Sequence, residues 1–151
     1  MYEKQYDIPV NEAGPFPVPL TDQIECAPFE EYLGMKIEKS DRSGTEMSMP
    51  FNVKLAQSKG LMHGGAIASL AHTTLAVAIK KQLPVGNDIE IITFSLRFHL
   101  PVRGGMVRAS GRVIEETDRD IRGEVLVYNC HGEKAATFSA AYRKERARKL
   151  S

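Results

Sequence analysis

The feature that most constrains the fold of this chain is a long run, residues 60–82, that is apolar on nearly every side. No aspartate or glutamate occurs between Met62 and Gly86. At about 100° per residue, its large apolar residues fall on three different faces of a helix, represented by Ile67, Leu75 and Ile79. A helix that is apolar all round must be enclosed by the rest of its protein. The sequence therefore predicts a central helix around which the other elements wrap.

The segments around this run have the two-residue alternation of strands. A hairpin is predicted on either side of the turn "SDRSG", followed after the helix by four strands over 89–100, 106–115, 121–129 and 135–142. A short helix is expected over 28–34, with proline at its start and glycine at its end. The last four strands follow one another through short turns, so they should pair antiparallel. The predicted class is α+β: one long central helix wrapped by a curved antiparallel sheet of about six strands.

Length and composition favour a single domain with flanking segments. The chain has 151 residues, enough for one domain with its own core. Residues 1–27 hold four closely spaced prolines and are interpreted as an extended arm. Residues 28–144 form the predicted domain, and residues 145–151 form a basic, solvated tail.

Charge and cysteine usage narrow the class of protein. Twenty basic residues against nineteen acidic residues give a net charge of +1, which does not favour a nucleic-acid partner. Cys26 and Cys130 are far apart and lack metal-ligand spacing, as expected of a reduced cytoplasmic protein. The first residues are polar and form no signal segment, and His63 and His72 interrupt the long apolar helix. We therefore expect no membrane partner and no metal site.

The long helix begins with His63-Gly64-Gly65, which predicts either a binding site or a tight helix entry. The first turn of a helix leaves backbone N–H groups unpaired, and the helix dipole makes that end partly positive. Glycine lets a ligand approach the backbone closely. An N–H aimed at a carbonyl oxygen would stabilise the oxyanion formed when water adds to that carbonyl. The simpler alternative is that the glycines only permit a tight entry into the helix.

From about Phe29 to Arg143 the chain resembles the hotdog fold, and within it the phenylacetate-type acyl-CoA thioesterases. The resemblance rests on "QSKGLMHGG", on the "SLAH" that follows and on "FSLRFHLPVRGG". It implies hydrolysis of an acyl-CoA thioester to a free acid and coenzyme A, with no cofactor beyond the coenzyme A of the substrate. It also implies a homodimer joined edge to edge, with active sites between subunits, and often a dimer of dimers, that is, a homotetramer.

The same resemblance implies roles for individual residues. The Gly64 N–H would bind the oxyanion, and His63 would hold the loop and helix start in place or act directly in catalysis. Gln57 would orient the thioester or the attacking water, unless it is merely an exposed loop residue. Gly65 and Thr73 would contact the substrate.

His72 is where the sequence departs from the family, which normally has Asp or Glu at this position. Nine residues separate His63 from His72, which turns a helix by about half a circle and advances it by ~13 Å. The two residues would therefore serve different sites of a dimer. His72 could be a general base partnered by Asp88, Glu90 or His99, a ligand contact without hydrolysis, or a satisfied buried polar residue.

Cations would be needed for the phosphates of coenzyme A. The candidates lie in turns or at strand ends, although each could equally be a solvated surface charge: Arg103, Arg119, Arg122 and Arg143. The sequence thus predicts a thioesterase, with a non-hydrolytic acyl-CoA-binding or regulatory protein of the same fold as the alternative.

Overall fold

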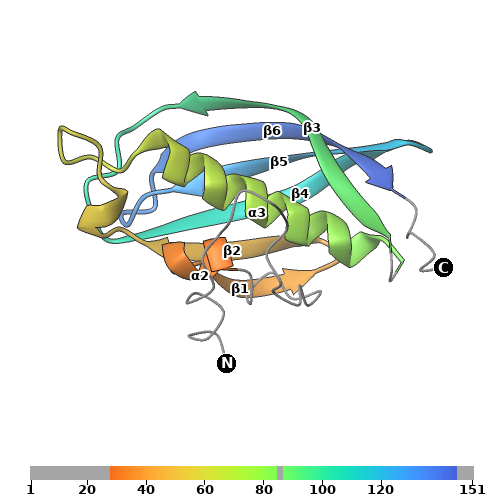
Figure 1. Ribbon diagram of the computed structural model, residues 1–151, viewed down its shortest axis with the longest axis horizontal. Helices are drawn as coiled ribbons and strands as arrows, with labels where there is room; N and C mark the ends of the chain where they lie inside the picture. Colours follow the sequence, from red (N-terminus) through yellow and green to blue (C-terminus); the bar gives the residue numbers. More distant parts are fainter. Residues whose placement is uncertain (1–27, 85–86, 146–151) are drawn as a thin grey trace, which may run out of the picture.

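A computed structural model describes residues 28–84 and 87–145 (Figure 1). The predicted arm over 1–27 and the tail after residue 145 lie outside the described residues. The helices are α2 (Pro28–Leu33), the 3₁₀ helix η2 (Val53–Leu55) and α3 (Gly64–Gln82). The strands are β1 (Lys36–Asp41), β2 (Gly44–Pro50), β3 (Asp88–Phe98), β4 (Met106–Glu116), β5 (Asp120–Tyr128) and β6 (Lys134–Glu145). Among the described residues, no helix is long and apolar enough to cross a membrane.

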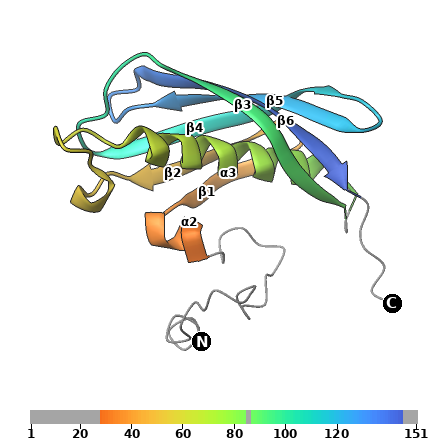
Figure 2. The ribbon, with the colours of Figure 1, turned by 45° about the horizontal axis from the view of Figure 1, so that its top comes forward.

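The six strands form one sheet in the order β1-β2-β4-β5-β6-β3, and every neighbouring pair is antiparallel. The sheet curves around α3, which lies along its concave face (Figures 1 and 2). β3 follows α3 in the chain but pairs with β6, so it forms one edge of the sheet and β1 forms the other. The predicted α+β class, with one central helix and a curved antiparallel sheet, is confirmed.

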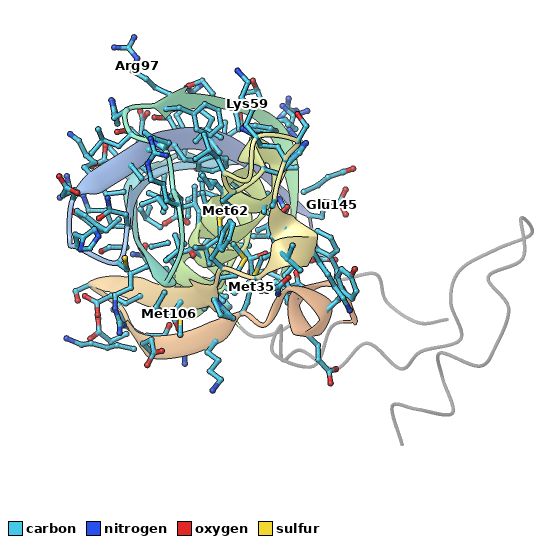
Figure 3. All side chains as sticks on the ribbon, turned by 90° about the vertical axis from the view of Figure 1, so that its left-hand side faces the viewer. Met35, Lys59, Met62, Arg97, Met106 and Glu145 are labelled. Atoms are coloured by element: carbon cyan, nitrogen blue, oxygen red, sulfur yellow. The ribbon has the colours of Figure 1, made fainter. Side chains whose placement is uncertain are left out.

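The core lies between α3 and the concave face of the sheet. Alternate residues of the central strands point toward the helix and are fully buried, among them Val107 of β4 and Val125 of β5. The helix contributes Leu70, Leu75 and Ile79, none of which has exposed surface. Figure 3 looks along the helix from its N-terminal end and shows Met62 inside the curve, whereas Arg97 projects outward from β3.

The predicted helix start at residue 60 is wrong, because α3 begins at Gly64. Residues 57–62 instead form a tight loop, closed by a hydrogen bond from the Gln57 N–H to the Leu61 carbonyl oxygen (2.7 Å) and by a bridge between Ala56 and Met62. Gly60 has a φ of 82°, which a helix does not allow. The loop therefore ends abruptly at His63, which becomes the residue before the helix.

The alternation predicted for β3 is broken by a bulge. The register with β6 shifts between Ile91 and Thr93, so Ile92 has no partner and is 46% exposed. Before the bulge Ile91 faces the helix, and after it Phe94 and Phe98 do so, as their pairing with inward-facing residues of β6 shows. The two phenylalanines are 54% and 53% exposed although they lie on the concave side, because α3 leaves that edge of the sheet uncovered.

α3 also remains half-exposed along one stripe, contrary to the expectation of full enclosure. Ala68, Ser69, His72 and Ala76 are only partly buried, whereas the residues toward the sheet are buried. One curved sheet covers the side of a helix that faces it and not the side that faces away. Burial of the remaining stripe would have to come from another part of the protein or from another subunit.

We predict that Gly123→Ala lowers the free energy of unfolding by about 1–3 kcal/mol, the usual cost of overpacking a core. A Cβ atom at Gly123 would lie 2.3 Å from Leu75 Cδ1 and 2.6 Å from the Arg112 carbonyl oxygen. The leucine can rotate, but the strand backbone cannot move without disturbing the sheet. Gly104→Ala is the matched control, because a Cβ atom there meets no atom within 4 Å. Denaturant unfolding that shows equal stability for both variants would contradict this account of the packing.

Candidate active site

His63 caps α3 and fixes how the loop enters it. Its Nδ1 accepts a hydrogen bond from the Gly65 N–H at 2.8 Å, and its own N–H donates to the Leu55 carbonyl oxygen at 2.7 Å. Its carbonyl oxygen accepts from the Ala66 N–H at 2.9 Å. Because Nδ1 is an acceptor here, the ring proton of neutral His63 lies on Nε2. These contacts favour the holding role predicted for His63.

The Gly64 N–H is left without an acceptor among the described residues. It is the first residue of α3, and the neighbouring donors of Gly65 and Ala66 are both taken by His63. The Phe98 ring from β3 lies directly beside Gly64: a Cβ atom built on this glycine would be 2.9 Å from Phe98 Cζ. A free N–H at a helix N-terminus, next to an apolar ring, is suited to a developing negative charge.

Gln57 is positioned by the loop that precedes the helix. Its N–H and carbonyl oxygen bond to Leu61 and Gly60, and its side-chain oxygen accepts from the Lys59 N–H. The side chain is half-buried, and its NH₂ group has no acceptor among the described residues. Gln57 therefore offers two hydrogen-bond donors on the same loop that leads to Gly64.

His72 lies half-buried in the middle of α3, against β6. Its ring stacks on the Tyr142 ring, with centroids 5.8 Å apart and an interplanar angle of 18°. The Tyr142 hydroxyl donates to the His72 carbonyl oxygen at 3.1 Å. Burial lowers the pKa of His72 below the usual 6.5, and the negative charge of Glu30 partly offsets this. Burial also raises the pKa of Tyr142 far above its usual range, so that phenol stays neutral at physiological pH.

The partners predicted for His72 are not beside it in this chain, and this prediction is corrected. Asp88 caps the Ile89 N–H (2.9 Å), Glu90 lies opposite Arg143 on the convex face of the sheet, and His99 Nε2 bonds to the Thr137 hydroxyl at 2.8 Å. All three belong to β3 or the residue after it, whose register turns them away.

The carboxylate near His72 is Glu30 of α2, which the sequence did not single out. Glu30 accepts a hydrogen bond from Thr73 Oγ1 at 3.3 Å, and Thr73 is buried. Its position depends on how α2 lies against α3, because Glu30 and His72 are forty-two residues apart in the chain. Two acidic residues in the short "PFEEYL" helix were the available signal.

The remaining predicted contacts are spread over the molecule. Gly65 is exposed, and its N–H is used by the cap. Arg103 lies in the loop whose Val102 carbonyl oxygen accepts from the Met62 N–H (2.9 Å), which brings it close to the helix entry. The other arginines lie where β5 begins and β6 ends, and one of them pairs with Asp120 at 3.2 Å: Arg119, Arg122 and Arg143. Across residues 28–84 and 87–145, no cluster of three His, Cys, Asp or Glu could hold a metal ion.

A central helix packed on the concave face of a curved antiparallel sheet, with a free N–H in its His-Gly-Gly entry, defines a hotdog-fold protein of the thioesterase class. The chain belongs to the thioesterase superfamily, whose sequence profile matches residues 59–136.

Individual relatives agree with this assignment. The proofreading thioesterase EntH of Klebsiella pneumoniae is 28% identical over 106 residues, which cover 70% of this chain and 77% of that protein. A solved thioesterase of Haemophilus influenzae superposes with a TM-score of 0.79 at 20% identity, covering 85% of this chain and 90% of its own. A thioesterase of Staphylococcus aureus gives a TM-score of 0.76 at 16% identity, covering 79% and 99%. At these identities the two solved structures show the shared fold alone.

We predict that His63→Ala destabilises the protein by about 0.5–2 kcal/mol, the usual cost of losing a helix N-cap. The substitution removes the acceptor of the Gly65 N–H. His63→Asn should recover most of this loss, because asparagine is also a good N-cap. Thermal and denaturant unfolding of both variants would test the prediction, and equal losses for Ala and Asn would show that the cap is not what His63 contributes.

Proposed function

We propose that this protein hydrolyses an acyl-CoA or closely related thioester to a free acid and a thiol, with coenzyme A present as part of the substrate. The observation that carries the proposal is the free Gly64 N–H at the start of α3, beside the Phe98 ring. Membership of the thioesterase superfamily supports the same chemistry.

The reaction needs an oxyanion donor, a base and a means of orienting water. The thioester carbonyl oxygen would accept from the Gly64 N–H while His72 removes a proton from water. The hydroxide adds to the carbonyl carbon, and the tetrahedral intermediate expels the thiolate, which takes the proton back from His72. Gln57 donors would orient the carbonyl or the water. Arg103, near the helix entry, is the best placed of the four arginines to contact a phosphate of coenzyme A.

A dimer would bring these groups together. His72 lies nine residues after His63, about 13 Å along α3 and on the opposite face, so one chain would not direct both at one carbonyl. The half-exposed stripe of α3, the unpaired edge of β3 and the exposed Phe94 and Phe98 support a homodimer joined at β3. Its sites would combine Gly64 and Gln57 of one subunit with His72 of the other. A dimer of dimers would then be the homotetramer.

Two further observations support the proposal. The Staphylococcus aureus thioesterase has been solved as two variants, one with a glutamine and one with a glutamate replaced by alanine. In its sequence these two residues are separated by the same number of positions as Gln57 and His72 are here. Within the described residues Cys130 is exposed and forms no disulfide, and we propose that the protein works in the reducing cytoplasm.

A thioester-binding protein without hydrolysis is the second candidate. The observation that favours it is the imidazole of His72, stacked on Tyr142, at the position where the family has a carboxylate. A hydrolysis screen across acyl-CoAs, run beside a binding assay with coenzyme A, separates the two functions. Binding without turnover would support the second candidate and exclude the first.

We predict that turnover rises with pH through a midpoint below about 6.5, because His72 acts as a base only when neutral and burial lowers its pKa. His72→Ala should reduce the rate by about 10²–10⁴-fold. His72→Asp restores the family residue and serves as the comparison. Undiminished hydrolysis by His72→Ala would exclude His72 as the base. An inactive parent with an active His72→Asp variant would identify a relative that has given up hydrolysis.

We also predict that two inactive variants restore activity when they share a dimer. Gly64→Val blocks the approach of the carbonyl, and His72→Ala lacks the base. In a mixed dimer, one site receives Gly64 from one chain and His72 from the other, so it is intact. Half of the dimers from an equal co-expression are mixed and each has one working site, giving roughly a quarter of the parent activity. Sedimentation should show the dimer, and a mixture as inactive as its components would exclude a shared site.

A further inference from the structure

α2 is held in place and directs Glu30 toward α3. Leu33 at the end of this helix and Met35 just after it are both buried in the core. The Met35 N–H donates to the Glu30 carbonyl oxygen at 3.0 Å, which closes the turn after the helix. The opposite face of α2 presents Phe29 and Tyr32 to the surface. The half-buried Glu30 side chain therefore belongs to a helix whose C-terminal end is anchored in the core by Leu33 and Met35.

Thr73 makes a contact that differs from those of its neighbours on α3. Ser69 and Thr74 each donate to the carbonyl oxygen four residues earlier, Gly65 and Leu70, both at 2.7 Å. That is the usual bond of a hydroxyl within a helix. The Thr73 hydroxyl instead donates across to Glu30 Oε1 at 3.3 Å, from a position that is 3% exposed. The carboxylate is thereby tied to the residue next to His72.

The electrostatic surroundings of His72 contain few other charged groups. Glu30 of α2, bonded to the adjacent Thr73, is near enough for its charge to raise the pKa of His72, and the ring of the neutral Tyr142 of β6 stacks on the imidazole. α3 has no other titratable side chain before Lys80, and Asp88 and Glu90 of β3 face away. No ion pair joins Glu30 and His72 directly among the described residues, so the carboxylate acts on the imidazole by its charge.

We propose that Glu30 is the positioning residue of this site: held by Thr73, it supplies from α2 the negative charge that α3 lacks beside His72. The catalytic consequence rests on the proposed function. When His72 accepts a proton from water, the resulting imidazolium is stabilised by Glu30, so His72 is a stronger base than its burial alone would allow. In place of the single carboxylate that the family resemblance implies at this position, the site would use an imidazole on α3 together with a carboxylate on α2.

The test is an NMR titration of the His72 ring in the full chain, which requires no turnover. The His72 signals are assigned by their loss in His72→Gln, since the chain has four histidines. Glu30→Gln keeps an acceptor for Thr73 but removes the charge, so the His72 midpoint should move to lower pH. Glu31→Gln, an exposed neighbour on the same helix, is the matched control and should leave the midpoint in place. An unchanged midpoint in Glu30→Gln would overturn the inference.

The pH–rate profile gives the second measurement. Glu30→Gln should move the rate midpoint in the same direction as the NMR midpoint and lower the rate above it. Thr73→Val should move both midpoints in the same direction but by less, because it releases the carboxylate without removing its charge. A lower rate with unmoved midpoints would indicate a merely structural role and overturn the inference. If Glu30→Gln moves the NMR midpoint but the parent hydrolyses no thioester, the Glu30–His72 coupling stands and the proposed function is wrong.

Discussion

The burial of α3 against one curved sheet is the interaction on which the rest of the structure depends. The helix has apolar residues on all sides, and over Gly123 the Leu75 side chain occupies the space that a side chain on the strand would need. At Gly111 the methyl group of Thr74 fills the same role. Two glycines on adjacent central strands thus let the helix lie deep in the sheet. A deeply packed helix is rigid, and its N-terminus and middle are held at fixed positions.

The rigidity of α3 fixes the positions of the proposed site residues that it carries. Catalytic groups need positions fixed by packing rather than by flexible loops. Gly64 and His72 are both on α3, while Gln57 is on a loop tied to it through the bond between His63 and Leu55. The side that the sheet does not cover carries His72. The same incomplete enclosure therefore leaves partly exposed surface on α3 and places the proposed base within it.

The sequence predicted most of the fold because the fold depends on local periodicity. The alternation of β4, β5 and β6 and the apolar faces of α3 come from short-range patterns. A helix start at residue 60 was wrong because the local bridge between Ala56 and Met62 and the positive φ of Gly60 make residues 57–62 a loop, which the apolar pattern does not reveal. A regular alternation over 89–100 does not foresee the bulge at Ile92, because no glycine or proline marks the shift of the pattern by one position.

The site was predictable only as far as the family motif extends. Gln57, His63 and Gly64 lie close together in the chain, within the motif on which the family resemblance rests. Their contacts with one another are therefore local. The surroundings of His72 are different, because Glu30 of α2 and Tyr142 of β6 each lie more than forty residues from His72 in the chain. Neither the contact between Thr73 and Glu30 nor the stacking on Tyr142 has a sequence pattern.

The identity of residue 72 and the position of Glu30 are physically linked. A carboxylate at 72 would be half-buried, which raises its pKa, and the charge of Glu30 would raise it further, because ionising it would place two negative charges close together. An imidazole responds in the opposite sense: burial lowers its pKa and the same Glu30 raises it, so the two effects partly cancel. With Glu30 tied to Thr73, histidine is therefore the residue at this position whose charged form is stabilised by the neighbouring carboxylate. A histidine at 72 therefore fits the proposal that the negative charge of this site is supplied from another helix.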